Sequence, residues 1–224
     1  IYSRVMVEPM IIAIDGPAAA GKGTLARRLA GHFGLAILDT GILYRAVGMK
    51  LVREGGDPDD ASAAADVARA LAPADLDADD LRTDAAADAA SRVSAVPAVR
   101  QALLEFQRAF AENPPDIASG NANGAILDGR DIGTVVCPNA DCKLFITADV
   151  EVRAKRRFLE LRERGLDAIH GRVLADMKER DARDSDRAVS PLEPAKDALQ
   201  LDTSEMDADQ AFAAALSFIT SENK

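Results

Sequence analysis

A glycine-rich turn between an apolar strand and a helix constrains the fold of this chain more than any other feature. Residues 16–22 read GPAAAGK and match the G-x-x-x-x-G-K pattern of a phosphate-binding loop. The apolar run Met10–Asp15 comes directly before the loop, and apolar residues at helical spacing, Leu25, Leu29 and Phe33, come after it. This order of strand, loop and helix is the context in which the motif binds phosphate.

The chemistry of the loop follows from its backbone. Gly16 and Gly21 permit a turn in which successive N–H groups point into one concavity, and the helix that begins near Lys22 adds the positive end of its dipole. Lys22 supplies a mobile charge for the β- and γ-phosphates of a nucleotide. Because alanine does not easily adopt a positive φ, we expect an ordinary backbone conformation at Ala19, in the middle of the loop.

Apolar runs elsewhere in the chain predict a five-stranded parallel sheet. Besides the first run they are Leu35–Leu38, Ala125–Leu127, Lys143–Thr147 and Ala198–Leu201, and long helical stretches separate them. Such alternation predicts an α/β fold of three layers, α/β/α, with helices on both faces of the sheet.

Two stretches are too long to be simple crossovers. Residues 57–115 are rich in Ala and Asp, but apolar spacing around Val67 and Leu71 favours a helical insertion over a disordered linker. Residues 151–187 carry dense charge of both signs, and we expect glycines 165 and 171 to break them into two helical segments. They are either a solvated surface helix pair or a mobile cover over phosphates. The remaining core comprises residues 10–56, 116–150 and 188–224, and residues 1–9 are expected to be an extension upstream of a start at Met10.

Composition excludes several classes of protein. The 224 residues are 48% hydrophobic and 29% charged, with no run near the ~20 apolar residues that a membrane-spanning helix needs. The net charge of -10 argues against a general nucleic-acid binder, although the preponderance of arginine among the basic residues favours local anion sites. Cys137 and Cys142 support neither a disulfide framework nor a zinc site, which fits a reducing cytoplasm. No pattern of a coiled coil or large apolar face is present, so we expect a monomer.

Further motifs indicate which family the chain resembles. The loop continues as GKGT, a form typical of nucleoside monophosphate (NMP) kinases. The segments LDTGILYR (38–45), ILDGRDIGTVV (126–136) and KERDARDSDRAVSPL (178–192) closely resemble bacterial cytidylate kinases, and the resemblance runs from Met10 to the C-terminus. It implies a P-loop kinase fold with an NMP-binding insertion at 57–115 and a lid at 151–187. The implied reaction transfers the γ-phosphoryl group of ATP, with Mg²⁺, to CMP or dCMP.

The resemblance also implies roles for individual residues. ATP is expected at Gly16, Pro17, Ala18, Ala19, Ala20, Gly21, Lys22, Gly23, Thr24 and Arg157. The acceptor is expected at Thr40 and, for its phosphate, at Arg45, Arg130 and Arg187; at Ser91, Arg100 and Asp131 for the base; and at Arg180 and Asp184 for the ribose. Catalysis is expected from Lys22, Arg130, Arg156, Arg157 and Arg187. Ser91 is otherwise an ordinary helix-surface serine. Arg153, Arg156 and Arg157 are expected on or near one face of the lid helix, where they either close over ATP or form a solvated charged face.

The expected chemistry explains both what the sequence contains and what it lacks. A phosphate oxygen that is already anionic near neutral pH needs no general base, so His32 and His170 are assigned structural positions. Cytosine differs from uracil by its N4 donor and N3 acceptor, so its pocket needs an acceptor beside a cationic donor. Asp128 ends the ILD strand, where it either holds Mg²⁺ through water or is a buried carboxylate that caps the next turn.

One departure from the family leaves rival functions open. Many bacterial cytidylate kinases carry a small β-sheet before the segment that matches Asp80–Pro97, and between Leu76 and Leu81 there is room only for a turn. The insertion should therefore be smaller and mostly helical, and the breadth of acceptors is in question. A kinase of UMP, AMP or shikimate is one rival. A nucleotide-dependent switch protein is another, but it predicts an Asn-Lys-x-Asp motif that the sequence lacks.

Overall fold

A computed structural model describes residues 9–187 and 189–222. Residues 1–8 of the expected N-terminal extension, and Ala188 in the third family motif, lie outside the described residues. No helix in the described ranges has both the length and the apolar character that crossing a membrane requires.

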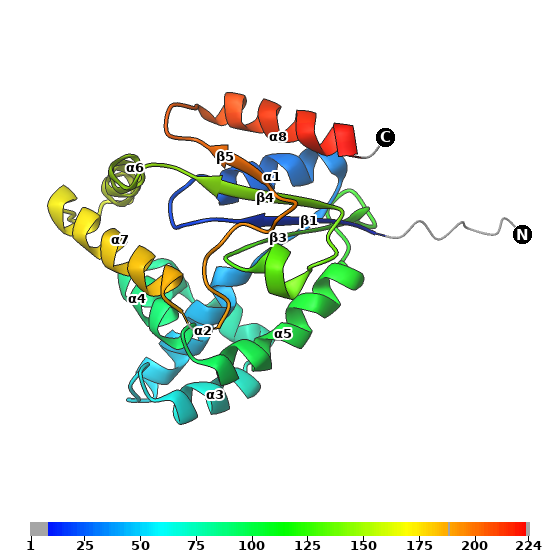
Figure 1. Ribbon diagram of the computed structural model, residues 1–224. Helices are drawn as coiled ribbons and strands as arrows, with labels where there is room; N and C mark the ends of the chain where they lie inside the picture. The colour runs from blue at the N-terminus through cyan, green and yellow to red at the C-terminus, as the bar shows by residue number, and fades with distance from the viewer. Residues whose placement is uncertain (1–8, 188, 223–224) are drawn as a thin grey trace, which may run out of the picture.

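The sheet has five parallel strands, as the alternation of apolar runs predicts. They are β1 (Met10–Asp15), β2 (Ala36–Asp39), β3 (Gly124–Gly129), β4 (Cys142–Thr147) and β5 (Leu199–Asp202). Their order across the sheet is β2-β3-β1-β4-β5, so the strand that leads into the phosphate loop is central. All five carboxyl ends meet at one edge, on the left in Figure 1.

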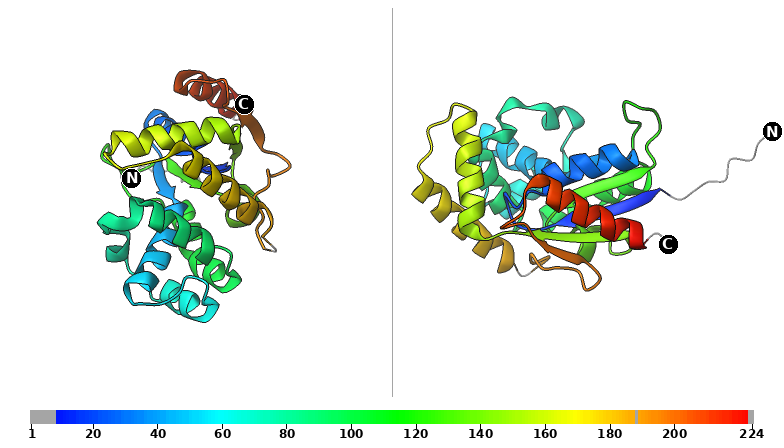
Figure 2. Two further views of the ribbon diagram at one scale, coloured as in Figure 1. Left: turned by 90° about the vertical axis from the view of Figure 1, so that its left-hand side faces the viewer. Right: turned by 90° about the horizontal axis from the view of Figure 1, so that it is seen from above.

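Helices cover both faces of this sheet. The α-helices are α1 (Lys22–Phe33), α2 (Thr40–Arg53), α3 (Ala61–Arg69), α4 (Asp84–Val93), α5 (Pro97–Glu112), α6 (Val150–Glu163), α7 (His170–Ser185) and α8 (Ala208–Glu222). The short helical segments are η1 (Pro73–Asp77), η2 (Asp79–Arg82) and η3 (Ile132–Val136). The right-hand view of Figure 2 shows α8 lying across the strands.

Alternation along the strands divides the core in two. Ile12 and Ile14 of β1 pack with α1 and α8 on one face, and Ala13 packs with α5 and η3 on the other. Burial on both faces accounts for the continuous apolar strands and completes the three α/β/α layers.

The stretch expected to be a helical insertion is helical and has its own core. Residues of α2, α3, α4 and α5 form a separate apolar cluster that includes Val47, Val67, Val93 and Leu103. The described residues of 57–115 contain no strand, in agreement with the missing β-rich segment. In the left-hand view of Figure 2 the helices of the insertion lie at the bottom, and α6 and α7 lie in front of the strand ends.

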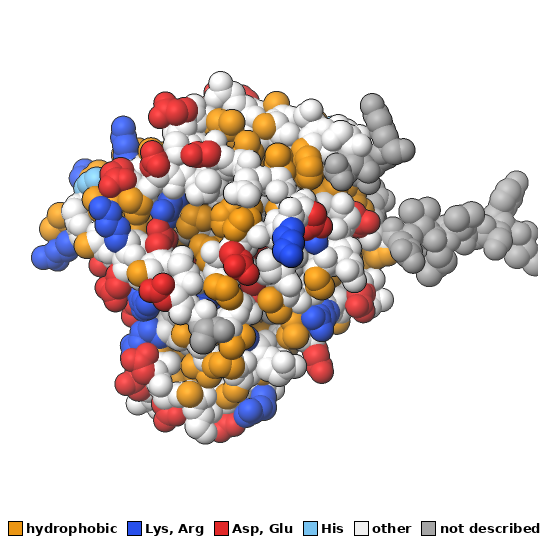
Figure 3. Space-filling view, viewed as in Figure 1, with side chains coloured by type: hydrophobic (Ala, Val, Ile, Leu, Met, Phe, Trp, Pro, Cys, Tyr) orange, Lys and Arg blue, Asp and Glu red, His pale blue; other side chains and the backbone are white. Residues whose placement is uncertain are grey.

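The two helices of the expected lid pack on each other through a small cluster that includes Leu161 and Met177. The break between them falls at residues 164–169, where Gly165 has a φ of 74°. The prediction of a second break at Gly171 was wrong, because Gly171 lies in the first turn of α7, where a glycine is tolerated. Figure 3 shows basic and acidic side chains intermingled on this flank of the molecule.

Candidate functional site

A cavity of about 880 Å³ opens at the carboxyl ends of the strands, between the insertion and α6–α7. It gathers most of the residues predicted from the sequence: Ala18, Ala19, Gly21, Lys22, Gly23, Thr24, Thr40, Arg45, Ser91, Arg100, Asp128, Arg130, Asp131, Arg156, Arg157, Arg180, Asp184 and Arg187. Gly16, Pro17 and Ala20 of the loop, and Arg153, do not line it. The position fits the rule that ligands of α/β sheets bind outside the strand carboxyl ends.

The phosphate loop presents a buried lysine to this cavity. The side chain of Lys22 is only 6% exposed; its Nζ donates to the Pro17 carbonyl oxygen at 3.0 Å and lies 3.6 Å from Oδ1 of Asp128. Burial, and then the charge of Arg130, lower the pKa of Lys22 to about 8. Helix α1 begins without a side-chain cap or an acidic residue in its first turn, so its first N–H groups are free for an anion.

The backbone of the loop corrects the expectation for Ala19. Its φ is 59°, in the left-handed region that alanine normally avoids, so the prediction of an ordinary conformation was wrong. Gly16 is required for a different reason, because a Cβ there would lie 1.9 Å from the carbonyl oxygen of Ile146. Closing the loop against β4 therefore imposes a strained turn, and the packing of Ala19 against the α6–α7 cluster favours a methyl group at this position.

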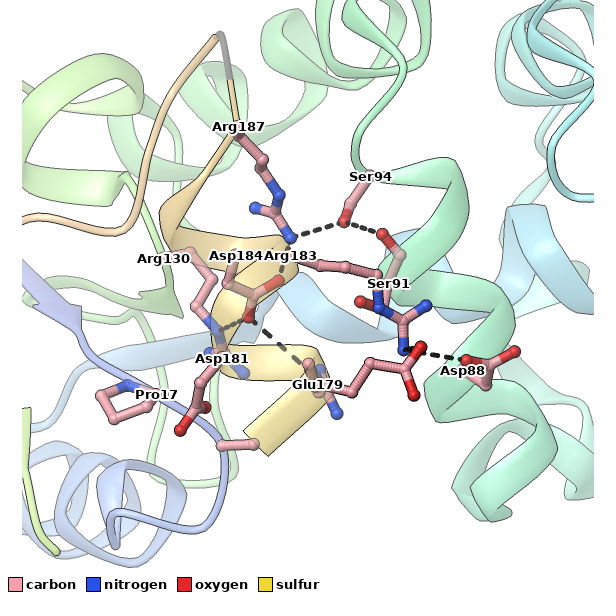
Figure 4. Close-up of polar contacts among 12 residues, drawn as sticks. Pro17, Asp88, Ser91, Ser94, Arg130, Glu179, Asp181, Arg183, Asp184 and Arg187 are labelled. Atoms are coloured by element: carbon pink, nitrogen blue, oxygen red, sulfur yellow. Dashed lines mark hydrogen bonds and ion pairs between the residues drawn. The ribbon is translucent and has the colours of Figure 1, made fainter. Parts of the chain in front are cut away.

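Asp184 organises the arginines expected to hold the phosphate and ribose of the acceptor (Figure 4). It is 1% exposed, its Oδ1 contacts Arg187, and its Oδ2 accepts from Arg130 Nε at 3.2 Å and lies 4.0 Å from Arg180 Nε. Burial opposes ionisation of Asp184, but Arg130, Arg187 and Arg180 hold its pKa below the ordinary value. Burial beside other arginines lowers the pKa of Arg180 to about 9. The cluster is thus an excess of positive charge around one carboxylate, which favours an anionic ligand.

The three residues expected to read the base lie together. The Arg100 guanidinium contacts the Asp131 carboxylate, and both side chains are buried. The Arg100 guanidinium also lies 5.5 Å from the centre of the Tyr44 ring, in a cation–π arrangement. The hydroxyl of Ser91 is buried and has no hydrogen-bond partner among the described residues. Because buried polar groups are normally hydrogen-bonded, this hydroxyl is available to a ligand in the cavity.

Arg45 and Thr40 line the cavity from the start of α2. Arg45 Nη1 donates to the carbonyl oxygen of Leu81 at 2.8 Å, and burial lowers its pKa. Thr40 Oγ1 donates to the carbonyl oxygen of Asp128 at 2.9 Å. Both side chains are therefore fixed at the edge where an acceptor phosphate is expected.

The three arginines expected on the lid helix do not act alike. Arg156 and Arg157 line the cavity; Arg156 donates to the Thr203 carbonyl oxygen at 2.6 Å, and Arg157 contacts Asp84 on the insertion. Arg153 is buried and donates to Ala148 and to Asp181 of α7. Arg153 Nη1 also donates to the carbonyl oxygen of Ala18, in the phosphate loop, at 3.3 Å. Arg153 therefore ties α6 to α7 and to the loop, and its role over ATP stays a prediction.

Asp128 fits a role near a bound cation better than a capping role. Its carboxylate lies among the loop residues beside Lys22, and burial raises its pKa although Lys22 opposes the shift. The turn that follows it is capped by another residue, Asp15, whose carboxylate accepts from Ile132 and Gly133. Mg²⁺ bound to a nucleotide keeps most of its water ligands, so one carboxylate at this position is a suitable donor set.

The sequence pointed to some cavity residues but not to their neighbours. Ser94 is the residue that follows α4, three positions after Ser91. Its hydroxyl accepts from Arg187 at 2.8 Å and its carbonyl oxygen accepts from Arg100 at 3.1 Å. Asp84 and Asp88, one turn apart on α4, face Arg157 and Arg183 of the lid helices. These two aspartates were not among the residues predicted from the sequence, although their helical spacing from Ser91 could have placed them on the same face of α4. His32 and His170 pack against phenylalanine rings and do not line the cavity.

Comparison with known proteins agrees with this geometry. The cytidylate kinase family model matches residues 12–221. Similar proteins include the cytidylate kinases of Paramagnetospirillum magneticum, 65% identical with 94% of this chain and 98% of that protein covered, and of Rhodospirillum rubrum, 61% identical with 94% and 97% covered. A solved structure of an uncharacterized protein from Eubacterium ventriosum shares the fold, with a TM-score of 0.53, 18% identity, and 96% of this chain and 99% of that chain covered. Because the family model spans most of the chain and the relatives are this similar, the chain belongs to the cytidylate kinase family.

Proposed function

We propose that this protein transfers the γ-phosphoryl group of MgATP to CMP or dCMP, giving CDP or dCDP and ADP, as a cytoplasmic monomer. The observation that carries the proposal is the pairing of Arg100 with Asp131 in the cavity that the Ser91 hydroxyl and the phosphate loop also line. A buried cationic donor next to carboxylate and hydroxyl acceptors complements the N3 and N4 groups of cytosine.

The mechanism needs charge and alignment more than proton transfer. A phosphate oxygen of the acceptor attacks the γ-phosphorus in line, the bond to the leaving β-phosphate oxygen breaks, and no base is needed. Arg45, Arg130 and Arg187 hold the acceptor phosphate, while Lys22 and the first N–H groups of α1 hold the donor. Arg156 and Arg157 close over the transferring group and help to exclude water.

Asp128 is the residue that we propose for the cation. Bound Mg²⁺ neutralises charge on the β- and γ-phosphates of ATP. Asp128 would hold it through water, beside Lys22.

A panel of acceptors tests the proposal. The measurement is ADP formation by the purified protein with MgATP and, separately, CMP, dCMP, UMP, AMP, GMP and shikimate. We expect strong turnover confined mainly to CMP and dCMP. Equal turnover of UMP or AMP would remove the base assignment and leave the phosphate chemistry, whereas no turnover with any acceptor would favour a nucleotide-dependent switch.

Replacement of Arg100 tests the base pocket directly. We expect Arg100→Met to lower kcat/KM for CMP by about ten- to hundredfold, because a buried hydrogen bond from a charged group is lost, and to affect UMP much less. Steady-state kinetics with both acceptors measures the difference. Equal losses for CMP and UMP would contradict a role in base selection.

A further inference from the structure

Asp15 is a buried carboxylate that the proposed mechanism leaves without a role. It is the last residue of β1, immediately before the phosphate loop, and is 4% exposed. Its Oδ1 accepts from the N–H of Ile132 at 2.8 Å and its Oδ2 from the N–H of Gly133 at 2.7 Å. These are the first two N–H groups of η3, so Asp15 caps a helical segment 117 residues away in the chain.

This cap occupies a position that another residue would normally fill. The residue before η3 is Asp131, and an aspartate at this position usually accepts from the first N–H groups of its own helix. Asp131 makes no such bond, and its carboxylate contacts Arg100 instead. With the helix N-terminus already satisfied by Asp15, Asp131 is released from a local role and faces the cavity.

We propose that Asp15 is a positioning residue for acceptor selection: by capping η3 from the end of β1, it leaves the Asp131 carboxylate free to pair with Arg100 and read the base. The same carboxylate joins the strand that leads into the phosphate loop to the segment that carries Arg130 and Asp131. It thereby fixes the position of the ATP-binding loop relative to the residues that bind the acceptor nucleotide. The effect on CMP rests on the proposed function, whereas the cap itself does not.

The electrostatics of Asp15 provide a readout. Burial raises the pKa of Asp15 to about 6, helped by the charge of Asp131 and opposed by the two N–H bonds and the charge of Lys22. The other titratable groups nearby are Cys137, after η3, and Lys143 of β4, whose stem packs beside Gly133. Protonation as the pH falls through 6 replaces one acceptor with an O–H group that faces an N–H. The cap should therefore weaken below about pH 6.

The first experiment compares CMP with UMP across pH. The acceptor phosphate titrates near pH 6 in both nucleotides, so the ratio of their kcat/KM values cancels that effect. In the wild type we expect the ratio to fall as the pH drops from 8 to 5.5, and in Asp15→Asn to be lower by about tenfold at pH 8 and flat with pH. The KM for ATP should change far less. An unchanged ratio at pH 8 in the folded variant would overturn the proposal.

A matched control and a second measurement separate positioning from general damage. Asp60 also accepts two backbone N–H bonds, at the start of α3, outside the cavity; Asp60→Asn should leave the ratio unchanged. In wild-type protein without ligand, NMR should show the amide protons of Ile132 and Gly133 shifting together with a midpoint near pH 6. If the two amides show no joint titration at any acidic pH at which the protein stays folded, the cap is refuted, whether or not CMP is the substrate and whether or not Asp15→Asn folds.

Discussion

The side chain of Lys22 is buried by the fold itself, without a bound phosphate. Its partners are a carbonyl oxygen and one carboxylate, and its pKa falls to about 8 because the charged form loses water. The negative charge of a bound polyphosphate stabilises the buried ammonium group in place of the lost water. Burial of Lys22 therefore favours the binding of ATP. The binding of ATP and the binding of a proton to Lys22 are therefore coupled.

We expect Lys22→Met to lower kcat by about a thousandfold while the fold remains intact, because the lost charge serves the transferring phosphoryl group and the methionine has a similar length. Steady-state kinetics, with circular dichroism to check folding, measures the effect. Near-normal turnover in the folded variant would contradict the assignment of the loop.

The lowered pKa predicts proton uptake when ATP binds. At pH 8.5 Lys22 is mostly neutral in the free protein, and negative phosphates raise its pKa on binding, so MgATP should bring roughly half a proton or more with it. Below pH 7, where Lys22 is already charged, the uptake should vanish. Titration calorimetry in buffers of different ionisation enthalpy measures it. Equal uptake by Lys22→Met would assign the proton to another group.

At the scale of elements, helix α4 connects the acceptor insertion to the lid. Asp84 and Asp88 lie one turn apart on one face and meet Arg157 of α6 and Arg183 of α7. Arg157 is expected to serve ATP, yet in this structure it contacts Asp84. We therefore propose that Asp84 of the insertion competes with ATP for Arg157.

We expect Asp84→Asn to lower the KM for ATP by about two- to fivefold, because a half-exposed ion pair of this kind holds Arg157 by only a modest energy. Asp88→Asn, one turn along the same helix, releases Arg183 instead and is the matched control. Kinetics at varied ATP gives both values. A similar change in the two variants, or a higher KM in Asp84→Asn, would contradict the competition.

At the scale of the whole molecule, the cavity is built from three packed units. The sheet has an apolar cluster on each face, and the insertion and the α6–α7 pair have one each. Helix α5 joins the insertion to the sheet, Ala18 and Ala19 join the loop to α6–α7, and an ion pair between Asp88 and Arg183 connects the insertion to α7. A ligand that touches all three should rigidify them together, whereas α8 lies on the sheet face at a distance from the cavity.

Hydrogen exchange should show this pattern. We expect CMP alone to slow amide exchange in α4 and α7 by about tenfold or more, because local opening of either helix would break its contacts with the ligand. Exchange in α8 should stay unchanged and is the internal control. Protection confined to the phosphate loop, or spread evenly over the chain, would contradict an acceptor site between insertion and lid.

The sequence by itself determined the strand order along the chain, the phosphate loop and the helical character of residues 57–115, because hydrophobic period and glycine spacing are local properties. Only the tertiary structure decided contacts between distant segments. The strain at Ala19 comes from closure of the loop against β4 and the lid cluster, the burial of Arg153 from the packing of α6 on α7, and the cap of η3 from a carboxylate 117 residues away. Many residues in the chain have the chemistry that these contacts need, and packing decides which of them meet. No local pattern in the sequence shows which residues these are.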